Sequence, residues 1–254
     1  NLAHNKNEVT RIANAEGIIH GDPDVLSNQT TEMYRAQVGY PIGYFYGYST
    51  DGVFQSEEQI ANYKGAKLDG TKPGDVIWVD RDHNGVIDDG DQGMIGDPNP
   101  DYNLGLSLTA SYKGFDISMT MNGVFGNQID YTRQNYTSDI FGRWHGEGTS
   151  NRLPRLTSGT HSNWQYVSDL YMEDGDYFRM QNLTIGYDFK KLFKNLPLKQ
   201  LRLYVAAQNL FTITGYSGMD PEVGYGGYQN WVSGIDLGFY PSPRTYMVGA
   251  NIKF

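Results

Sequence analysis

The last eleven residues, 244–254, alternate between apolar side chains and polar or small ones. The apolar set shares one parity: Tyr246, Val248, Ala250, Ile252 and Phe254. Strict period-two alternation predicts a strand with one apolar and one wetter face. Because an unpaired edge strand invites association and is usually blunted by charge or proline, we expect this strand to be paired. Two interpretations stand: the closing strand of an outer-membrane β-barrel, whose spanning strands have about 9–11 residues, or the last strand of a β-sandwich.

The same alternation recurs in four earlier segments, residues 102–112, 115–124, 177–189 and 201–209. Only Lys113 and Gly114 separate the first two segments, which predicts a tight hairpin. In the third segment the apolar parity switches near Asn182, which indicates a bulge. The pattern therefore predicts an all-β fold built from long strands.

Shorter elements lie between the long strands. Residues 33–48 also alternate but contain Pro41, which cannot donate a hydrogen bond within a sheet. We therefore expect the first half of this segment to form an edge strand or a bend. We also expect short strands near residues 9–12 and 76–79. Residues 55–63 predict one or two helical turns with Ser56 as N-cap.

The connections between the long strands are of two kinds. Residues 113–114 and 190–199 are short connections, whereas residues 127–176 and 214–243 are long, rich in Gly, Tyr and Trp, and without strong periodicity. Long structureless segments are usually functional or mobile. Outer-membrane barrels show this asymmetry, with short periplasmic turns and long extracellular loops, and sandwiches rarely do. Aromatic residues lie near the strand ends, as they do in the girdles at the two membrane interfaces of a barrel. The alternative is that aromatic residues are simply common in strands.

Composition narrows the functional classes. The chain has 254 residues and a net charge of -9, with no Lys/Arg excess, so no nucleic-acid role is implied. It has 31 Gly and 20 Tyr, and no run of 18 apolar residues that predicts a membrane-spanning helix. Cysteine is absent, which excludes disulfides and thiolate metal sites. The sequence opens without methionine or a signal-like apolar segment, so we expect a processed or partial chain.

Residues 80–91 carry the sharpest local motif, D-R-D-H-N-G-V-I-D-D-G-D. It matches the D-x-[DN]-x-[DN]-G core of the EF-hand calcium loop, in which oxygen ligands at alternate positions surround one cation. The candidate ligands are Asp80, Asp82, Asn84, the backbone carbonyl of Val86, Asp88 and Asp91. Asp91 stands where the helical EF-hand has a bidentate Glu. The motif predicts a structural calcium ion, with a solvated acidic turn as the alternative.

No catalytic constellation emerges, so we expect a protein that is not an enzyme. The five histidines show no metal-ligand spacing, and nothing places the pair Glu173 and Asp174 across a cleft. Aromatic residues of the long loops are candidates for contact with a substrate or a partner protein, or for packing of the loops themselves. They are Trp144, Trp164, Tyr166, Tyr225, Tyr228 and Trp231.

Several blocks of the sequence together carry a family resemblance. The longest reads G-D-V-I-W-V-D-R-D-H-N-G-V-I-D-D-G-D and continues through I-G-D-P-N-P-D-Y. The blocks are residues 74–102, 43–55, 153–156, 176–187 and 203–222, and the terminal Phe254. They resemble the C-terminal region of SusC/RagA-type TonB-dependent outer-membrane transporters, keep that family's order and cover nearly the whole chain.

The resemblance implies a segment, residues 1–254, of a barrel of about 22 strands. The plug domain, the TonB box and most strands lie outside this chain, including the first strand, with which residues 244–254 pair. It also implies an integral outer-membrane protein of a Gram-negative bacterium, surrounded by lipid, that imports glycan or peptide oligomers with energy from the TonB complex.

The expected partners are the rest of the barrel and its plug, and a SusD-like surface lipoprotein that acts as a lid. Tyr246 and Phe254 would belong to the signal read by the barrel-assembly machinery. The alternative is a secreted, calcium-stabilised β-module that binds glycans.

Overall fold

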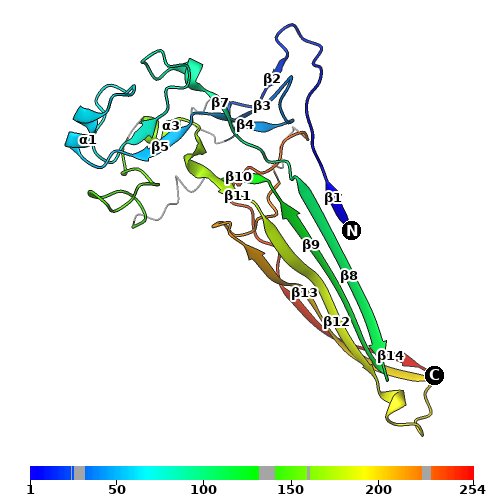
Figure 1. Cartoon of the computed structure of the whole chain (residues 1–254). Helices are drawn as coiled ribbons and strands as arrows, with labels where there is room; N and C mark the ends of the chain where they lie inside the picture. The colour runs from blue at the N-terminus through cyan, green and yellow to red at the C-terminus, as the bar shows by residue number, and fades with distance from the viewer. Residues whose placement is uncertain (24, 26–31, 132–140, 159–160, 225–229) are drawn as a thin grey trace.

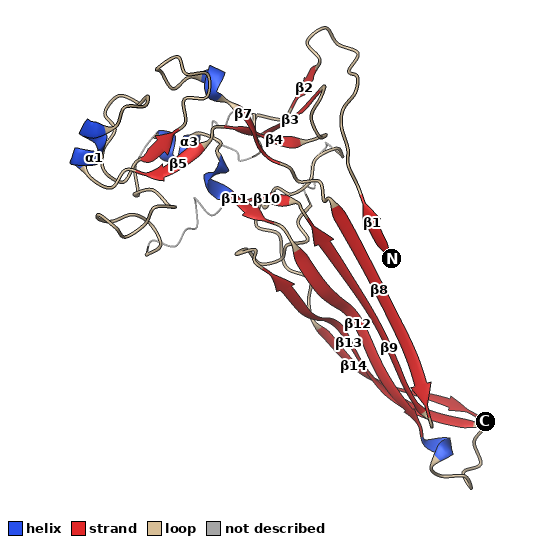
Figure 2. Cartoon of the chain, viewed as in Figure 1, coloured by secondary structure: helices blue, strands red, loops and turns tan. Residues whose placement is uncertain are grey.

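The computed structural model describes residues 1–23, 25, 32–131, 141–158, 161–224 and 230–254. These residues form an all-β structure with a long sheet at one end and several short sheets at the other (Figure 1). Figure 2 shows that the short helices lie in the connections. None of the helices in the described ranges is long and apolar enough to cross a membrane.

The long sheet has six antiparallel strands in the order β1-β8-β9-β12-β13-β14. Its strands are β1 (Leu2–His4), β8 (Tyr102–Tyr112), β9 (Phe115–Phe125), β12 (Tyr177–Asp188), β13 (Gln200–Thr214) and β14 (Thr245–Lys253). The four alternating segments and the final strand predicted from the sequence are therefore confirmed. β13 extends five residues beyond the predicted end.

The register places side chains of one kind in rows across the strands. One row reads Ala110, Ile117, Ile185, Val205 and Val248, and a row on the other face reads Ser107, Thr120, Asn182, Gln208 and Thr245. Because side chains alternate between the two faces of a sheet, this register sorts the sheet into an apolar and a polar face.

The apolar face of the sheet is exposed in this chain. Val248 is 86% exposed, Val205 52% and Tyr246 68%, and the described residues provide no second sheet against this face. A β-sandwich buries such a face in its core. The sandwich interpretation is therefore wrong, and the exposed apolar face fits the lipid-facing side of a barrel.

The polar face carries an ion pair that spans three strands. Arg202 on β13 donates from Nε and Nη2 to the two carboxylate oxygens of Asp116 on β9, at 2.8 and 2.5 Å. Gly186 on the intervening β12 makes this possible, because a Cβ there would lie 2.5 Å from Nη2 of Arg202. A bidentate pair of this kind holds the three strands in one register.

Two local predictions for the sheet are confirmed. Lys113 and Gly114 both have positive φ, 49° and 94°, as a two-residue hairpin turn requires. The register of β12 shifts between Met180 and Asn182, where the parity switch predicted a bulge. β14 pairs with β13 on one side, and no described residue pairs with its other side.

The other end of the molecule holds three small sheets. Their strands are β2 (Ile18–His20), β3 (Tyr34–Gln37), β4 (Tyr44–Gly47), β5 (Thr50–Val53), β6 (Val76–Trp78), β7 (Gly93–Gly96), β10 (Gln128–Asp130) and β11 (Met172–Asp174). The helices are α1 (Glu57–Asn62), α3 (Ser162–Gln165) and the 3-10 turns η1 (Asp89–Asp91), η2 (Asp169–Tyr171) and η3 (Phe189–Lys191). η3 alone lies at the far end of the long sheet (Figure 1).

The predictions for the short elements are partly right. Ser56 caps α1 by accepting a hydrogen bond from the amide of Gln59, as predicted. The break at Pro41 separates β3 from β4, and β6 lies where residues 76–79 predicted a strand. The strand expected near residues 9–12 is wrong: that segment is irregular, and the chain instead contributes β1 and β2 on either side of it.

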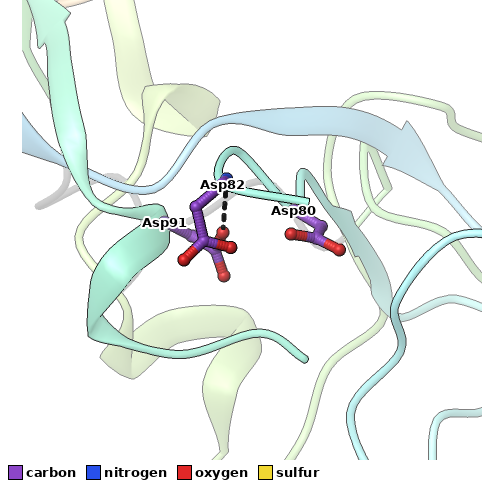
Figure 3. A group of neighbouring side chains, drawn as sticks. All are labelled: Asp80, Asp82 and Asp91. Atoms are coloured by element: carbon purple, nitrogen blue, oxygen red, sulfur yellow. Dashed lines mark hydrogen bonds between the residues drawn. The ribbon is translucent and has the colours of Figure 1, made fainter. Parts of the chain in front are cut away.

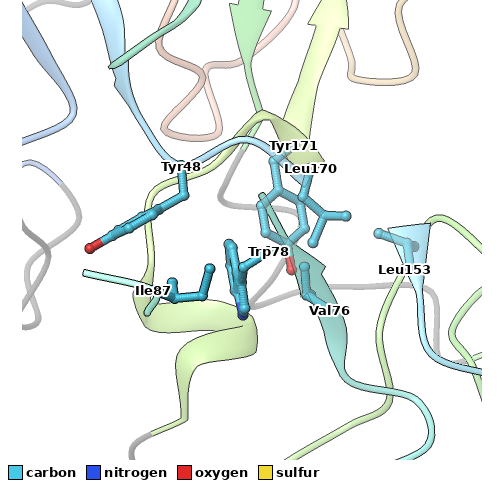
Figure 4. Close-up of a cluster of buried hydrophobic side chains, with 7 residues drawn as sticks. All are labelled: Tyr48, Val76, Trp78, Ile87, Leu153, Leu170 and Tyr171. Atoms are coloured by element: carbon cyan, nitrogen blue, oxygen red, sulfur yellow. The ribbon is translucent and has the colours of Figure 1, made fainter. Parts of the chain in front are cut away.

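Buried aromatic and aliphatic side chains give this end two cores. The first contains Met33, Tyr34, Phe45, Val167, Val232 and Ile235. The second, drawn in Figure 4, contains Tyr48, Val76, Trp78, Ile87, Leu153, Leu170 and Tyr171. Both draw residues from segments 127–176 or 214–243, so the expectation that these segments lack structure is wrong for their described parts. Their buried side chains need partners distant in sequence, and so leave no local periodicity.

Candidate functional site

The acidic loop of residues 80–91 lies between β6 and β7 and is anchored by a buried aliphatic side chain. Ile87 is 6% exposed and packs in the second core beside Trp78. Left-handed backbone at His83 and Gly85, with φ of 60° and 89°, turns the chain sharply on itself. The loop therefore folds back on itself beside the second core.

Three carboxylates of the loop converge. Asp80, Asp82 and Asp91 each offer an oxygen, and these oxygens lie within 4.8 Å of one another (Figure 3). Ligands bound to one calcium ion at about 2.3–2.6 Å can lie no more than about 5 Å apart, so this spacing fits one calcium ion. The donor set is also suitable, since calcium takes hard oxygen ligands.

Asp91 is fully buried and organises the loop backbone. Its Oδ1 accepts from the amide of Arg81 at 2.7 Å, and its Oδ2 accepts from the amide of Asp88 at 2.9 Å. Each bond uses one of the two lone pairs of its oxygen, so both oxygens keep one lone pair for an ion. Asp91 is therefore placed to anchor the loop backbone and the ion together.

The other two predicted side-chain ligands lie in the same turn. Asn84 donates from Nδ2 to Asp82 and Asp88, at 3.1 and 3.3 Å, and its Oδ1 accepts from the amide of Val86 at 2.7 Å. Val86 itself is 59% exposed. The structure thus brings all the predicted ligand residues into one turn.

The loop aromatics lie in several packing environments. Tyr166 stacks on Tyr48 at 4.6 Å between ring centroids, and Trp231 meets Tyr34 edge-on at 5.2 Å. The indole of Trp144 donates to Gln55 at 3.2 Å. Trp164 lies half-buried in α3. Tyr225 and Tyr228 lie outside the described residues.

A polar cavity of about 670 Å³ opens among the loops. Arg152, Asp169, Glu173 and Asp174 contribute charged groups to its lining. Burial raises the pKa of the Asp169 carboxyl, while hydrogen bonds from Thr50 act in the opposite direction. The sequence alone does not reveal this cavity, because its lining comes from six separate segments of the chain. Of the candidates named from the sequence, only Glu173 and Asp174 belong to it.

Two buried ionic clusters fix the loops, and neither was predicted. Asp75 accepts from Arg155 Nε at 2.7 Å and from Asn163 Nδ2 at 2.9 Å. Arg179, at the start of β12, donates to Glu222 at 2.8 Å and also to Asp220.

Hydrogen bonds rather than burial determine the protonation of Asp220. Burial acts to raise the pKa of the Asp220 carboxyl, but the amides of Ser242 and Glu222, together with Arg179, hold it below the ordinary value of 3.8. The carboxylate therefore stays charged and ties the 214–243 segment to the long sheet.

Comparison with known proteins relates this architecture to a family. The TonB-dependent receptor P3 of Formosa agariphila is 33% identical over all of this chain, which covers 26% of that protein. The TonB-dependent receptor SusC of Bacteroides thetaiotaomicron is 29% identical, again over the whole chain, which covers 24% of it. The chain belongs to the SusC/RagA-type TonB-dependent receptors. This confirms the family expected from the sequence blocks.

Solved structures agree in fold. A structure of the RagAB peptide transporter matches the whole chain with a TM-score of 0.70 at 20% identity, and a 'closed-closed' RagAB peptide importer matches with 0.66. The chain covers 26% of each matched chain. No family model matches the sequence.

Location and class follow from the family. TonB-dependent receptors are outer-membrane β-barrel proteins and not enzymes, so this SusC/RagA-type chain is part of an integral outer-membrane protein. It spans about a quarter of the length of the curated relatives it matches.

Proposed function

We propose that this chain supplies strands and outer loops to an importer of glycan or peptide oligomers. The supporting observation is the two-faced sheet, with an exposed apolar face, a polar face crossed by the Asp116–Arg202 pair, and an unpaired β14 edge. In a barrel the apolar face meets lipid, the polar face lines the lumen, and the free edge pairs with a strand from outside this chain. Energy would come from the TonB complex, through a plug domain also outside this chain.

A SusD-like lipoprotein is the proposed lid over the loops. One solved relative is the RagAB peptide importer and one curated relative is SusC, so peptide and glycan are both represented among similar proteins. The polar cavity beside Arg152 and Glu173 is suited to either oligomer, since both offer many hydrogen-bonding groups. Trp144, Trp164, Tyr166 and Trp231 are half-buried in the loops outside this cavity and remain candidates for substrate or lid contact.

Uptake by whole cells tests the proposal. Cells that express the full-length receptor are supplied with labelled oligosaccharides or labelled peptides, with and without a functional TonB. We expect one class to enter only when TonB functions, and to stop entering when the SusD-like partner is deleted. Uptake of neither class, or a purified protein that stays soluble and monomeric without detergent, would overturn the proposal.

We further propose that the 80–91 loop binds one structural calcium ion. Asp80, Asp82, Asn84, Asp88 and Asp91 would supply side-chain oxygens and Val86 its carbonyl, and Asp91 would also hold the loop backbone in place. The ion would neutralise three carboxylates that otherwise repel one another over less than 5 Å. It would therefore pin the loop onto the second core and would take no part in a reaction.

Metal content of the purified full-length receptor tests the calcium proposal. The double variant Asp80→Ala with Asp82→Ala should lose one calcium per protein and expose the loop to proteases. The control, Asp51→Ala with Asp69→Ala, removes the same charge from exposed positions nearby and should keep the metal. Equal calcium content in the parent and the first variant would show that the loop is only a solvated acidic turn.

A further inference from the structure

Lysines gather at the end of the long sheet that has the short connections. Six of the ten lysines of the chain lie there, although the chain as a whole has a net charge of -9. They are Lys113 in the hairpin, Lys190, Lys191, Lys194 and Lys199 between β12 and β13, and Lys253 at the end of β14. Figure 1 shows the β8–β9 turn, η3 and the C-terminus together at this end. Lys253 shares a face of β14 with Thr245 of the polar row, and we call the other five residues the basic rim.

The positive charge of the basic rim is not neutralised within the described residues. None of the ion pairs there involves a lysine, and all members of the rim except half-buried Lys190 are exposed. The two nearby side-chain carboxylates are occupied. Asp116 pairs with Arg202, and Asp188 accepts from the amides of Lys190 and Leu201.

Exposed apolar side chains adjoin the rim. Their exposures run from 53% to 82%, and they are Tyr112, Phe115, Leu192, Phe193 and Phe254. The ring of Phe115 lies 4.4 Å from that of Tyr187, which continues the band onto β12. Aromatic side chains of this kind anchor a membrane protein at headgroup level, while lysines extend their charged ends toward the headgroups.

We propose that the basic rim binds the anionic headgroups of phospholipids in the leaflet at the short-connection end of the barrel. This inference rests on the proposed barrel, which places the exposed apolar face in the hydrocarbon. Charge complementarity selects the occupant, because uncompensated lysines at headgroup depth attract phosphate-bearing lipids of net negative charge over zwitterionic ones. Each lysine near such a surface raises affinity about fivefold.

Lipid retention by the full-length receptor tests this. Receptor reconstituted in bilayers of equal phosphatidylglycerol and phosphatidylcholine is extracted, and the ratio of the two lipids that stay bound is measured by native mass spectrometry. The rim variant changes Lys191, Lys194 and Lys199 to Gln. The control variant changes Lys6, Lys64 and Lys72 to Gln, which removes the same charge from exposed positions at the loop end.

The parent and the control should retain phosphatidylglycerol preferentially. In the rim variant the ratio of retained phosphatidylglycerol to phosphatidylcholine should be at least about tenfold lower. Circular dichroism of both variants checks that they fold like the parent. The inference would be overturned if the parent retained the two lipids equally, or if both variants lost the preference for phosphatidylglycerol to the same extent. It would also be overturned if millimolar inorganic phosphate abolished that preference. A protein that fails to enter bilayers at all would instead contradict the proposed barrel.

Discussion

Replacement of Arg179 by Met should release the 214–243 segment from the long sheet. The Arg179 side chain is 3% exposed and Asp220 12%, so the pair is buried, whereas Glu222 is 53% exposed. Removal of one member of a buried pair costs about 3–5 kcal/mol, and an exposed pair contributes less than about 1 kcal/mol. We therefore expect about 3 kcal/mol, almost all of it from the unpaired Asp220.

Hydrogen exchange measures this loss at defined amides. The amides of Glu222 and Ser242 donate to Asp220 at 3.0 Å each, so they report when the segment opens. A loss of about 3 kcal/mol in a local opening equilibrium speeds their exchange by about 100-fold. Amides in the middle of the long sheet, such as that of Ile185, should exchange as in the parent.

Two further variants sharpen the result. Arg244→Met removes the same charge from an exposed arginine near the end of the same segment and should change exchange little. Asp220→Asn keeps an oxygen for the two amides, so adding it to Arg179→Met should recover part of the loss, with a coupling energy of about 1.5–3 kcal/mol. An acceleration below about threefold in Arg179→Met, or one equal to that of the Arg244 control, would refute the reasoning.

Three other changes follow from the contacts described. Gly186→Ala places a Cβ 2.5 Å from Nη2 of Arg202, so it should displace the guanidinium from Asp116. The free energy of unfolding measured in urea should fall by about 1–2 kcal/mol. An unchanged free energy would contradict the role given to the Asp116–Arg202 pair across β12. Asp75→Ala leaves the half-buried guanidinium of Arg155 and the buried amide of Asn163 without their acceptor. It should cost about 3 kcal/mol, whereas the same change at exposed Asp69 should cost under about 0.5 kcal/mol. A hydrogen bond to Glu32 raises the pKa of His20 above 6.5, against a smaller, opposite effect of burial. Protonated His20 therefore contributes its full stabilisation of the fold below pH 6.5, and this contribution is lost as the pH rises through the pKa of His20 in the folded protein. The melting temperature should fall between pH 6 and 8, and His20→Gln should flatten that fall; an unchanged slope would show that other groups set it.

The sequence by itself determined the strands of the long sheet and their local details. Period-two alternation marks β8, β9, β12, β13 and β14 because each strand faces two different environments. The Lys113-Gly114 turn, the bulge near Asn182 and the Ser56 cap were also predictable, since each depends on residues within a few positions of one another. The turn of the acidic loop belongs to the same class, because most of its hydrogen bonds join residues within the twelve.

Only the tertiary structure decided what joins segments far apart in the chain. Arg202 reaches Asp116 across 86 positions, and Arg179 reaches Asp220 across 41, so no local pattern could reveal either pair. The polar cavity, the two cores of the loop end and the pairing of β1 with β8 have the same origin. The alternation of apolar and polar residues also could not show that the apolar face is exposed. A barrel and a sandwich require the same two-faced strand, and they differ only in what covers its apolar side.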